Sequence, residues 1–187
     1  MHNGMNTIDN AVSEVIGVML MISVTLIIVA LVAVYATGAA SGDEQSVRAS
    51  LIASEVMSGE DEDEYMVVFE HMAGDPLHLN QTTVSLGVRD DATRHIVVKN
   101  GKKDQNDKNN LKKEVYLQRF TNRGDKFMVQ LGDRFVLYAD GKDDNGDLYW
   151  GEGKTFTVES GHYLTYRFID RRTGAPISSG EIAVPEF

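Results

Sequence analysis

The chain has 187 residues, a formal net charge of −10 and an isoelectric point near 4.9. This acidity disfavours a nucleic-acid partner, because nucleic-acid binding depends on clustered lysine and arginine. The absence of cysteine excludes disulfide bonds, cysteine-based metal sites and thiol catalysis. The length is sufficient for one long helix and one domain of about 125 residues.

A long apolar stretch follows a mostly polar segment of ten residues at the N-terminus. Residues 15–42 contain no charged side chain, and Ser23 and Thr25 interrupt the stretch only mildly. Because a helix of about 20 apolar residues crosses a bilayer core, the stretch predicts a membrane-spanning helix. The alternatives fit less well. A buried core helix is usually shorter and has a polar stripe, and a cleaved secretory signal has an apolar region of about 7–15 residues after a basic segment.

The start of this stretch carries a family motif. Residues 11–21 read AVSEVIGVMLM and resemble the N-terminus of archaeal type IV pilins, in which a short polar leader precedes A-V-S-P-V-I-G-V and an apolar helix. Glu14 stands where that family usually has proline, and residues 1–10 lack the basic residue that often precedes the processing point. The resemblance implies a class III signal peptide that prepilin peptidase removes after Ala11, leaving Val12 first. Cleavage after Asn10 is the alternative.

The resemblance also implies assembly. The apolar helix of a processed subunit would leave the membrane and pack against copies of itself, because a uniformly apolar helix is stable in lipid or in a helical bundle. Glu14 then has two interpretations. It is a solvated carboxylate at the membrane interface, or it pairs with the new α-amine of Val12 in a neighbouring subunit and fixes the register.

The next segment changes character. Val47, Leu51, Ile52 and Val56 fall at helical spacing, so residues 41–57 predict an amphipathic extension of the helix after a break between Gly38 and Gly42. The acidic run 59–64 then predicts a solvated linker.

From Tyr65 the pattern becomes that of short strands separated by turns, which predicts an all-β sandwich of immunoglobulin-like type. The expected strands are 65–69, 82–88, 95–99, 115–120, 127–131, 135–138, 154–158, 163–169 and 181–184. Within the strand 163–169, Leu164, Tyr166 and Phe168 share the face expected to point into the core. Residues 171–174 are expected to close a hairpin onto the last strand.

One turn of this region resembles the pilin family more loosely. Residues 71–77 read HMAGDPL and are similar to an H-x-G-G-D-x-L element, with Gly74, Asp75 and Pro76 expected to form a turn between strands. A metal site made of His71, His78 and Asp75 is the alternative, and it lacks a convincing further ligand.

Three other segments have candidate ligand or modification chemistry. Asp140–Asp147 resembles a calcium loop, but its first ligand position is Gly141, which favours a solvated hairpin loop. Asn80 opens the sequon Asn-Gln-Thr and is the candidate glycosylation site. Residues 101–114 are rich in lysine and predict an exposed loop. Residues with the spacing of a catalytic site or a phosphate-binding loop are not recognisable, so we predict no enzyme activity and no cofactor.

The combined prediction is an α+β protein with a leader at 1–11, a helix over 12–58, a linker at 59–64 and an extracellular β-sandwich at 65–187. The resemblance implies a subunit of a type IV pilus-like surface filament that serves adhesion. Its expected partners are copies of itself, prepilin peptidase, the pilus assembly machinery and the cell membrane, and no nucleic acid. It would be a single-pass membrane precursor with the C-terminal domain outside. The alternative is a binding module that the helix anchors permanently in the membrane.

Overall fold

The computed structural model of the chain describes residues 5–40, 45–59, 64–101, 111–121 and 124–186. Of residues 5–14 and 37–40 it describes the backbone alone. The chain divides into two compact units, Met1–Asp43 and Glu44–Phe187, and each is described here by itself.

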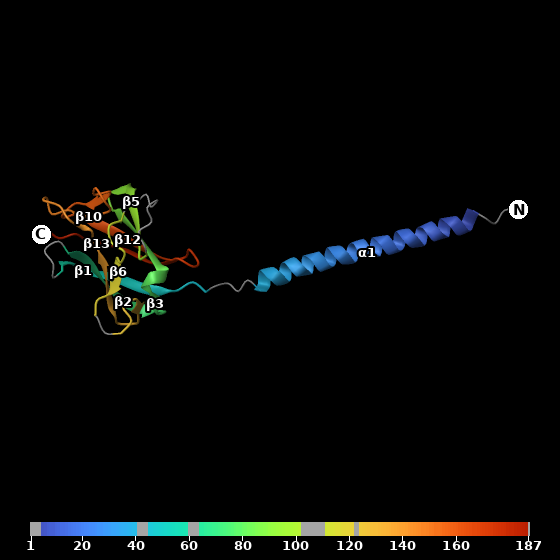
Figure 1. Cartoon of the computed structure of the whole chain (residues 1–187), viewed down its shortest axis with the longest axis horizontal. Coiled ribbons are helices and arrows are strands. Elements are labelled where there is room, and N and C mark those ends of the chain that lie inside the picture. The colour runs from blue at the N-terminus through green and yellow to red at the C-terminus, as the bar shows by residue number, and fades with distance from the viewer. Residues whose placement is uncertain (1–4, 41–44, 60–63, 102–110, 122–123, 187) are drawn as a thin grey trace. The chain divides into compact units, whose positions relative to one another are not determined.

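The first unit contains one helix, α1, which runs from Met5 to Ala40 (Figure 1). No proline interrupts these residues, so every amide N–H within the helix can donate to a carbonyl one turn earlier. The predicted apolar helix is therefore confirmed, with two differences in extent. It begins inside the segment assigned to the leader, and it ends before the predicted amphipathic extension.

Strand β1, Ala49–Ser58, replaces that amphipathic helix, so the helical prediction for these residues is wrong. The reason lies in the irregular pairing of β1 with β2, Tyr65–Gly74, which has register shifts after Ser50 and after Ala53. A register shift changes which side chains face the core, so the apolar residues no longer alternate strictly. Leu51 is buried and Val56 packs against the core five positions later, an odd spacing that breaks the alternation expected of a strand.

The second unit is almost entirely antiparallel β-structure, which confirms the predicted fold class. One four-stranded sheet has the order β1-β2-β8-β6, and the other has the order β13-β12-β4-β5. A three-stranded sheet, β11-β10-β9, and a two-stranded pair, β3-β7, complete it, and neither large sheet closes into a barrel. The bounds of the remaining strands are Leu77–His78 (β3), Thr82–Val88 (β4), Asp91–Lys99 (β5), Leu117–Arg119 (β6), Met128–Val129 (β7), Arg134–Tyr138 (β8), Gly141–Lys142 (β9), Leu148–Trp150 (β10), Phe156–Val158 (β11), Tyr163–Asp170 (β12) and Pro176–Ala183 (β13). A short 3-10 helix, η1, spans Leu79–Gln81.

The two large sheets pack face to face through aromatic side chains. Phe69 of β2 lies edge-on to Tyr166 and Phe168 of β12, with ring centroids 4.9 and 5.0 Å apart. Phe135 of β8 stacks on Phe69 at 5.3 Å and also contacts Phe168. Leu164, Tyr166 and Phe168 all point into this core, as the alternation predicted. The predicted hairpin between β12 and β13 is also present, with Gly174 at a φ of 70°.

Side chains also bind the two sheets together where β1 lies beside β13. The hydroxyl of Ser178 accepts a hydrogen bond from the Leu51 N–H and donates one to the Leu51 carbonyl, both at 3.2 Å. The Ala53 N–H donates to the hydroxyl of Tyr166 at 3.1 Å. Gly180 lies opposite Tyr166 on β13, and a Cβ there would lie 2.4 Å from that hydroxyl oxygen. The glycine therefore leaves the space through which Tyr166 reaches β1.

Candidate functional site: an apolar helix and a fastened joining segment

Helix α1 presents an apolar surface on all of its sides. The 22 residues Val15–Ala36 are long and apolar enough to cross a membrane by length and composition, and none of them is buried within the structure. Such a surface is stable only against lipid or against other apolar helices. The helix therefore has the properties of a membrane or assembly element.

The hydroxyl groups within this span are hydrogen-bonded inside the helix. Ser23 Oγ donates to the carbonyl of Met19, and Thr25 Oγ1 donates to the carbonyl of Ile22, each at 2.8 Å. An unpaired hydroxyl in hydrocarbon would cost several kcal/mol, on the order of 4–8 by transfer to an alkane. Because both groups have internal acceptors, neither requires a partner outside the helix.

The chain then enters the β-unit through residues 45–50, here called the joining segment. Asp75 binds this segment at two points: its N–H donates to the Arg48 carbonyl at 2.8 Å, and its Oδ2 accepts from the Arg48 N–H at 3.1 Å. Beside this contact, Val47 and Ala49 pack against the hydrophobic core. The joining segment is therefore fixed to the β-unit already at Arg48, the residue that precedes β1.

Asp170, at the end of β12, provides a second attachment for the joining segment. Its carboxylate is only 2% exposed. Burial alone would raise the pKa of Asp170, but hydrogen bonds from the N–H groups of Arg172 and Val47, together with the Arg172 guanidinium at 3.5 Å, lower it below the ordinary value. The ionised carboxylate thus ties Val47 to the β12-β13 turn.

The HMAGDPL element explains why the joining segment fits so closely. Gly74 has a φ of 105°, and a Cβ at this position would lie 2.1 Å from the carbonyl oxygen of Arg48. His71 is fully buried and its Nε2 lies 3.0 Å from the Asp75 carbonyl oxygen. The predicted turn is confirmed. Gly74, Asp75 and His71 together form the surface, here called the seat, on which the joining segment is held.

The predicted processing and pairing residues are only partly visible. Ala11, Val12 and Glu14 lie within the helical backbone of α1, and their side chains are outside the described residues. Cleavage beside Ala11 and a pairing role for Glu14 therefore stay predictions.

Asn80 lies in η1 with its side chain half-buried. Its Oδ1 accepts a hydrogen bond from Nδ2 of Asn100 at 3.1 Å, and its backbone carbonyl accepts one from the Arg171 guanidinium at 2.9 Å. A glycan on Asn80 would attach to its nitrogen, for which no acceptor is found among the residues that the structure describes. Glycosylation stays a prediction.

In the segment that resembles a calcium loop, Asp143 and Asp147 accept hydrogen bonds from within the β-unit. Asp143 Oδ1 accepts the N–H groups of Asp147 and Asn145, both at 3.0 Å, and its Oδ2 lies 3.4 Å from Nζ of Lys154. These hydrogen bonds, that of Asp147 first, lower the pKa of Asp143. Asp147 in turn accepts the Ser160 N–H. Among the described residues, no group of three or more histidine, aspartate or glutamate side chains is placed to hold a metal ion, including His71 and His78.

A buried polar network frames the lysine-rich segment 101–114. Asn100 Oδ1 accepts the N–H groups of Tyr116 and Leu117 at 2.8 and 2.7 Å, and the Tyr116 hydroxyl donates to the buried carboxylate of Asp140. Burial is the main cause that raises the pKa of Tyr116. The Asp140 carboxylate also accepts the Gly151 N–H at 2.7 Å. The sequence did not reveal this network, because its paired members lie 11 to 24 positions apart and no local motif links them.

An apolar helix ahead of a β-domain, joined by a fastened segment, is the architecture of a membrane-tethered or filament-forming subunit. Residues 10–51 match the family described as archaeal type IV pilin, N-terminal. The chain therefore carries an N-terminal segment of this family, and the resemblance seen in the sequence is confirmed. The match ends at Leu51, so it includes the whole joining segment and the first residues of β1.

Comparisons with solved structures and with curated proteins add little to this. The chain resembles the archaellum periplasmic stator protein complex FlaF and FlaG from Sulfolobus acidocaldarius, with 10% identity, a TM-score of 0.37 and coverage of 75% of this chain and 94% of that chain. It also resembles the stator protein FlaG from the same organism, with 9% identity, a TM-score of 0.35 and coverage of 73% and 100%. Likeness at these TM-scores carries no argument about function. No curated protein matched.

Proposed function

We propose that this protein is the structural subunit of a type IV pilus-like surface filament and assembles through α1 after prepilin peptidase has removed the leader. The observation that carries the proposal is the pilin N-terminal match over residues 10–51, which coincides with a helix that is apolar on every side. A processed helix of this kind becomes stable outside lipid when it packs against copies of itself.

The partners follow from the same mechanism. The membrane holds the precursor, prepilin peptidase cuts beside Ala11, and the assembly machinery transfers the helix into a bundle of identical helices. The β-domain is then displayed outside the cell, with the helix crossing the membrane once in the precursor. Adhesion as the purpose of the filament stays a prediction without structural support.

The fastened joining segment supports a role in assembly. The hydrogen bonds of Asp75 and Asp170 fix the point at which the β-unit begins, so a pull on the chain at this point would act on the folded domain rather than on a loose segment of it. A permanently anchored binding module would use the same attachment, so the two functions must be separated by the fate of the leader.

The test is mass spectrometry of the N-terminus in membranes and in filaments sheared from the cell surface. A subunit gives a trimmed chain that starts at Val12, present in the sheared fraction. An intact leader with all of the protein in the membrane fraction would refute the filament and leave the anchored binding module.

A further inference from the structure

The outer face of the β13-β12-β4-β5 sheet has a basic groove, although the protein as a whole is strongly acidic. The groove has a volume of about 600 Å³ and is lined by Arg89, Arg94 and Arg167, with His95 beside them. Glu181 is the one carboxylate among its lining residues, and it lies 3.3 Å from the Arg89 guanidinium. The groove therefore has an excess of positive charge on a chain with a net charge of −10.

The floor of the basic groove carries small side chains on three strands. Gly87 of β4 lies opposite Thr165 of β12, and a Cβ on Gly87 would lie 2.8 Å from Thr165 Oγ1. In the next row Ser85 lies opposite Arg167, which in turn lies opposite Ser179. An extended peptide can approach such a floor closely, while longer side chains at the rim contact it.

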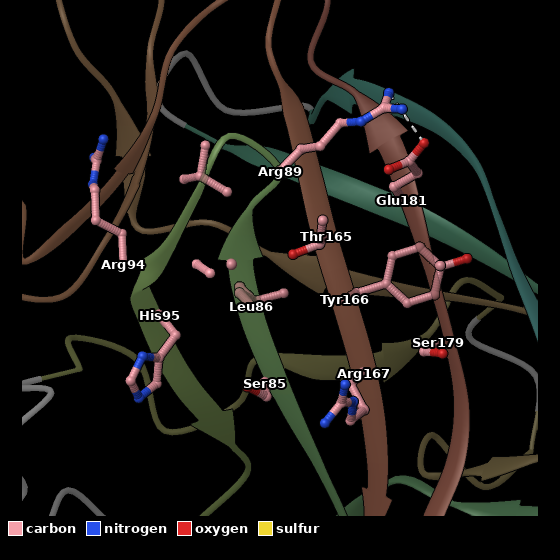
Figure 2. A pocket seen from close by; sticks show the side chains of 14 residues that line it. Ser85, Leu86, Arg89, Arg94, His95, Thr165, Tyr166, Arg167, Ser179 and Glu181 are labelled. Atoms are coloured by element: carbon pink, nitrogen blue, oxygen red, sulfur yellow. Dashed lines mark ion pairs between the residues drawn. The ribbon is translucent and has the colours of Figure 1, made fainter.

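The arginines of the rim are held in place by neighbouring groups. The Arg94 guanidinium donates to the Thr157 carbonyl of β11, and the Arg89 guanidinium lies 4.8 Å from the ring centroid of Tyr163. Figure 2 shows Arg89 above Thr165, Arg94 to the left of it and Arg167 below it. Arginines held in this way match the planar geometry of carboxylates.

We propose that the basic groove binds the acidic run Glu60–Glu64 of a second copy of this chain. The run has five consecutive carboxylates, which is the longest run of one charge in the sequence. Because copies with a net charge of −10 repel one another, a contact between them requires a local cationic surface, and the basic groove is such a surface. The inference rests on the proposed function, since a filament places copies side by side.

The run cannot fill the groove of its own chain. Ser58 pairs with Tyr65, and the Gly59 N–H donates to the Glu64 carbonyl at 2.6 Å, so the run is tethered to the β1-β2 end of the opposite sheet. Packed sheets lie about 10 Å apart, and the groove is on the far side of its sheet. Four residues between two paired ends extend about 7 Å from their base, which is too short. The contact must therefore form between two molecules.

The test uses the natural absence of cysteine in the full-length chain. Two differently tagged copies are co-expressed, one with Ser179→Cys on the groove floor and one with Asp61→Cys in the run, and intact cells are oxidised gently. A disulfide that joins both tags is expected. The matched control pairs Asp61→Cys with Ile52→Cys, an exposed position on β1 of the other sheet, and should yield at least about tenfold less mixed disulfide.

Charge reversal completes the test. Arg94→Glu with Arg167→Glu in the copy that carries Ser179→Cys should lower the mixed disulfide about tenfold. Glu60→Lys, Glu62→Lys and Asp63→Lys in the other copy should restore it. Equal yields for Ser179→Cys and Ile52→Cys, or no response to charge reversal, would overturn the inference. If filaments form but contain no mixed disulfide, the groove contact is refuted and the filament proposal stands. If the mixed disulfide forms in the membranes of cells that make no filaments, the groove contact is supported and the proposed filament function is refuted.

Discussion

Gly74 offers the most direct test of the seat that holds the joining segment. An alanine there would have a positive φ, which costs an L-residue about 1–2 kcal/mol. Its Cβ would also lie 2.1 Å from the Arg48 carbonyl oxygen, and this backbone atom cannot move without shifting the start of β1. Overpacking of this kind costs about 1–3 kcal/mol more. We therefore expect Gly74→Ala to lower the free energy of unfolding by about 3 kcal/mol.

Gly132→Ala is the matched control. Gly132 has a φ of 84°, and a Cβ there would meet no heavy atom within 4 Å. It should therefore cost only the backbone term of about 1–2 kcal/mol. The difference between the two variants isolates the contact with Arg48.

The assay is thermal unfolding of the full-length protein in detergent, followed by tryptophan fluorescence. Trp150 is the only tryptophan and is fully buried in the β-unit, so it reports the unfolding of that unit. A difference of about 1–2 kcal/mol between the variants corresponds to a further decrease of roughly 3–10 °C in Tm for Gly74→Ala. Trypsin should also cut faster after Arg48 in this variant. Equal Tm values and equal cleavage in the two variants would refute the reasoning.

Four further predictions test other features. The stability that Asp170 contributes is present above the ordinary aspartate pKa near 3.8 and is lost as the pH falls through its lowered folded pKa, so Asp170→Asn should be less stable at pH 7 and lose less below pH 4 in pH-dependent melts. Tyr166→Phe should cost about 1 kcal/mol in urea unfolding, because the Ala53 N–H loses its acceptor; an unchanged midpoint would refute this. Ala11→Leu should leave an uncut precursor on immunoblots, since the peptidase needs a small residue beside the cut, and normal trimming would move the site elsewhere. Glu14→Gln should preserve insertion and cleavage but reduce sheared filaments, with Glu14→Pro as the control, and full assembly of both would leave Glu14 as an interfacial residue only.

The sequence predicted those helices and strands in which the apolar side chains follow a single, uninterrupted pattern. The uncharged helix and the regular alternation of β4 and β12 are such elements, and the structure confirms both. It did not predict β1, because two register shifts break the alternation of a strand. It also missed β9 and β10, which are too short for a periodic signal.

In the candidate site, the sequence likewise predicted local structure but not contacts between residues far apart in the chain. The turn at Gly74 was predictable, because glycine, aspartate and proline have local conformational preferences. Its contact with Arg48 was not, since 27 positions separate Arg48 from Asp75 and no local pattern connects them. The attachment of Val47 to Asp170 is more distant still. The side chains of Ala11 and Glu14 act, by prediction, only in processing or assembly, so a single chain cannot test them.

The hydrogen bonds of Ser178 and Tyr166 to β1 have a consequence for crowded copies of the protein. An edge strand with unpaired amides can recruit a strand from another molecule, and the resulting sheets fuse irreversibly. Here two amides of the β1 edge, those of Leu51 and Ala53, are already occupied by side chains. Closely spaced β-domains can therefore touch through their surfaces and separate again as intact folded units, without exchanging strands at this edge.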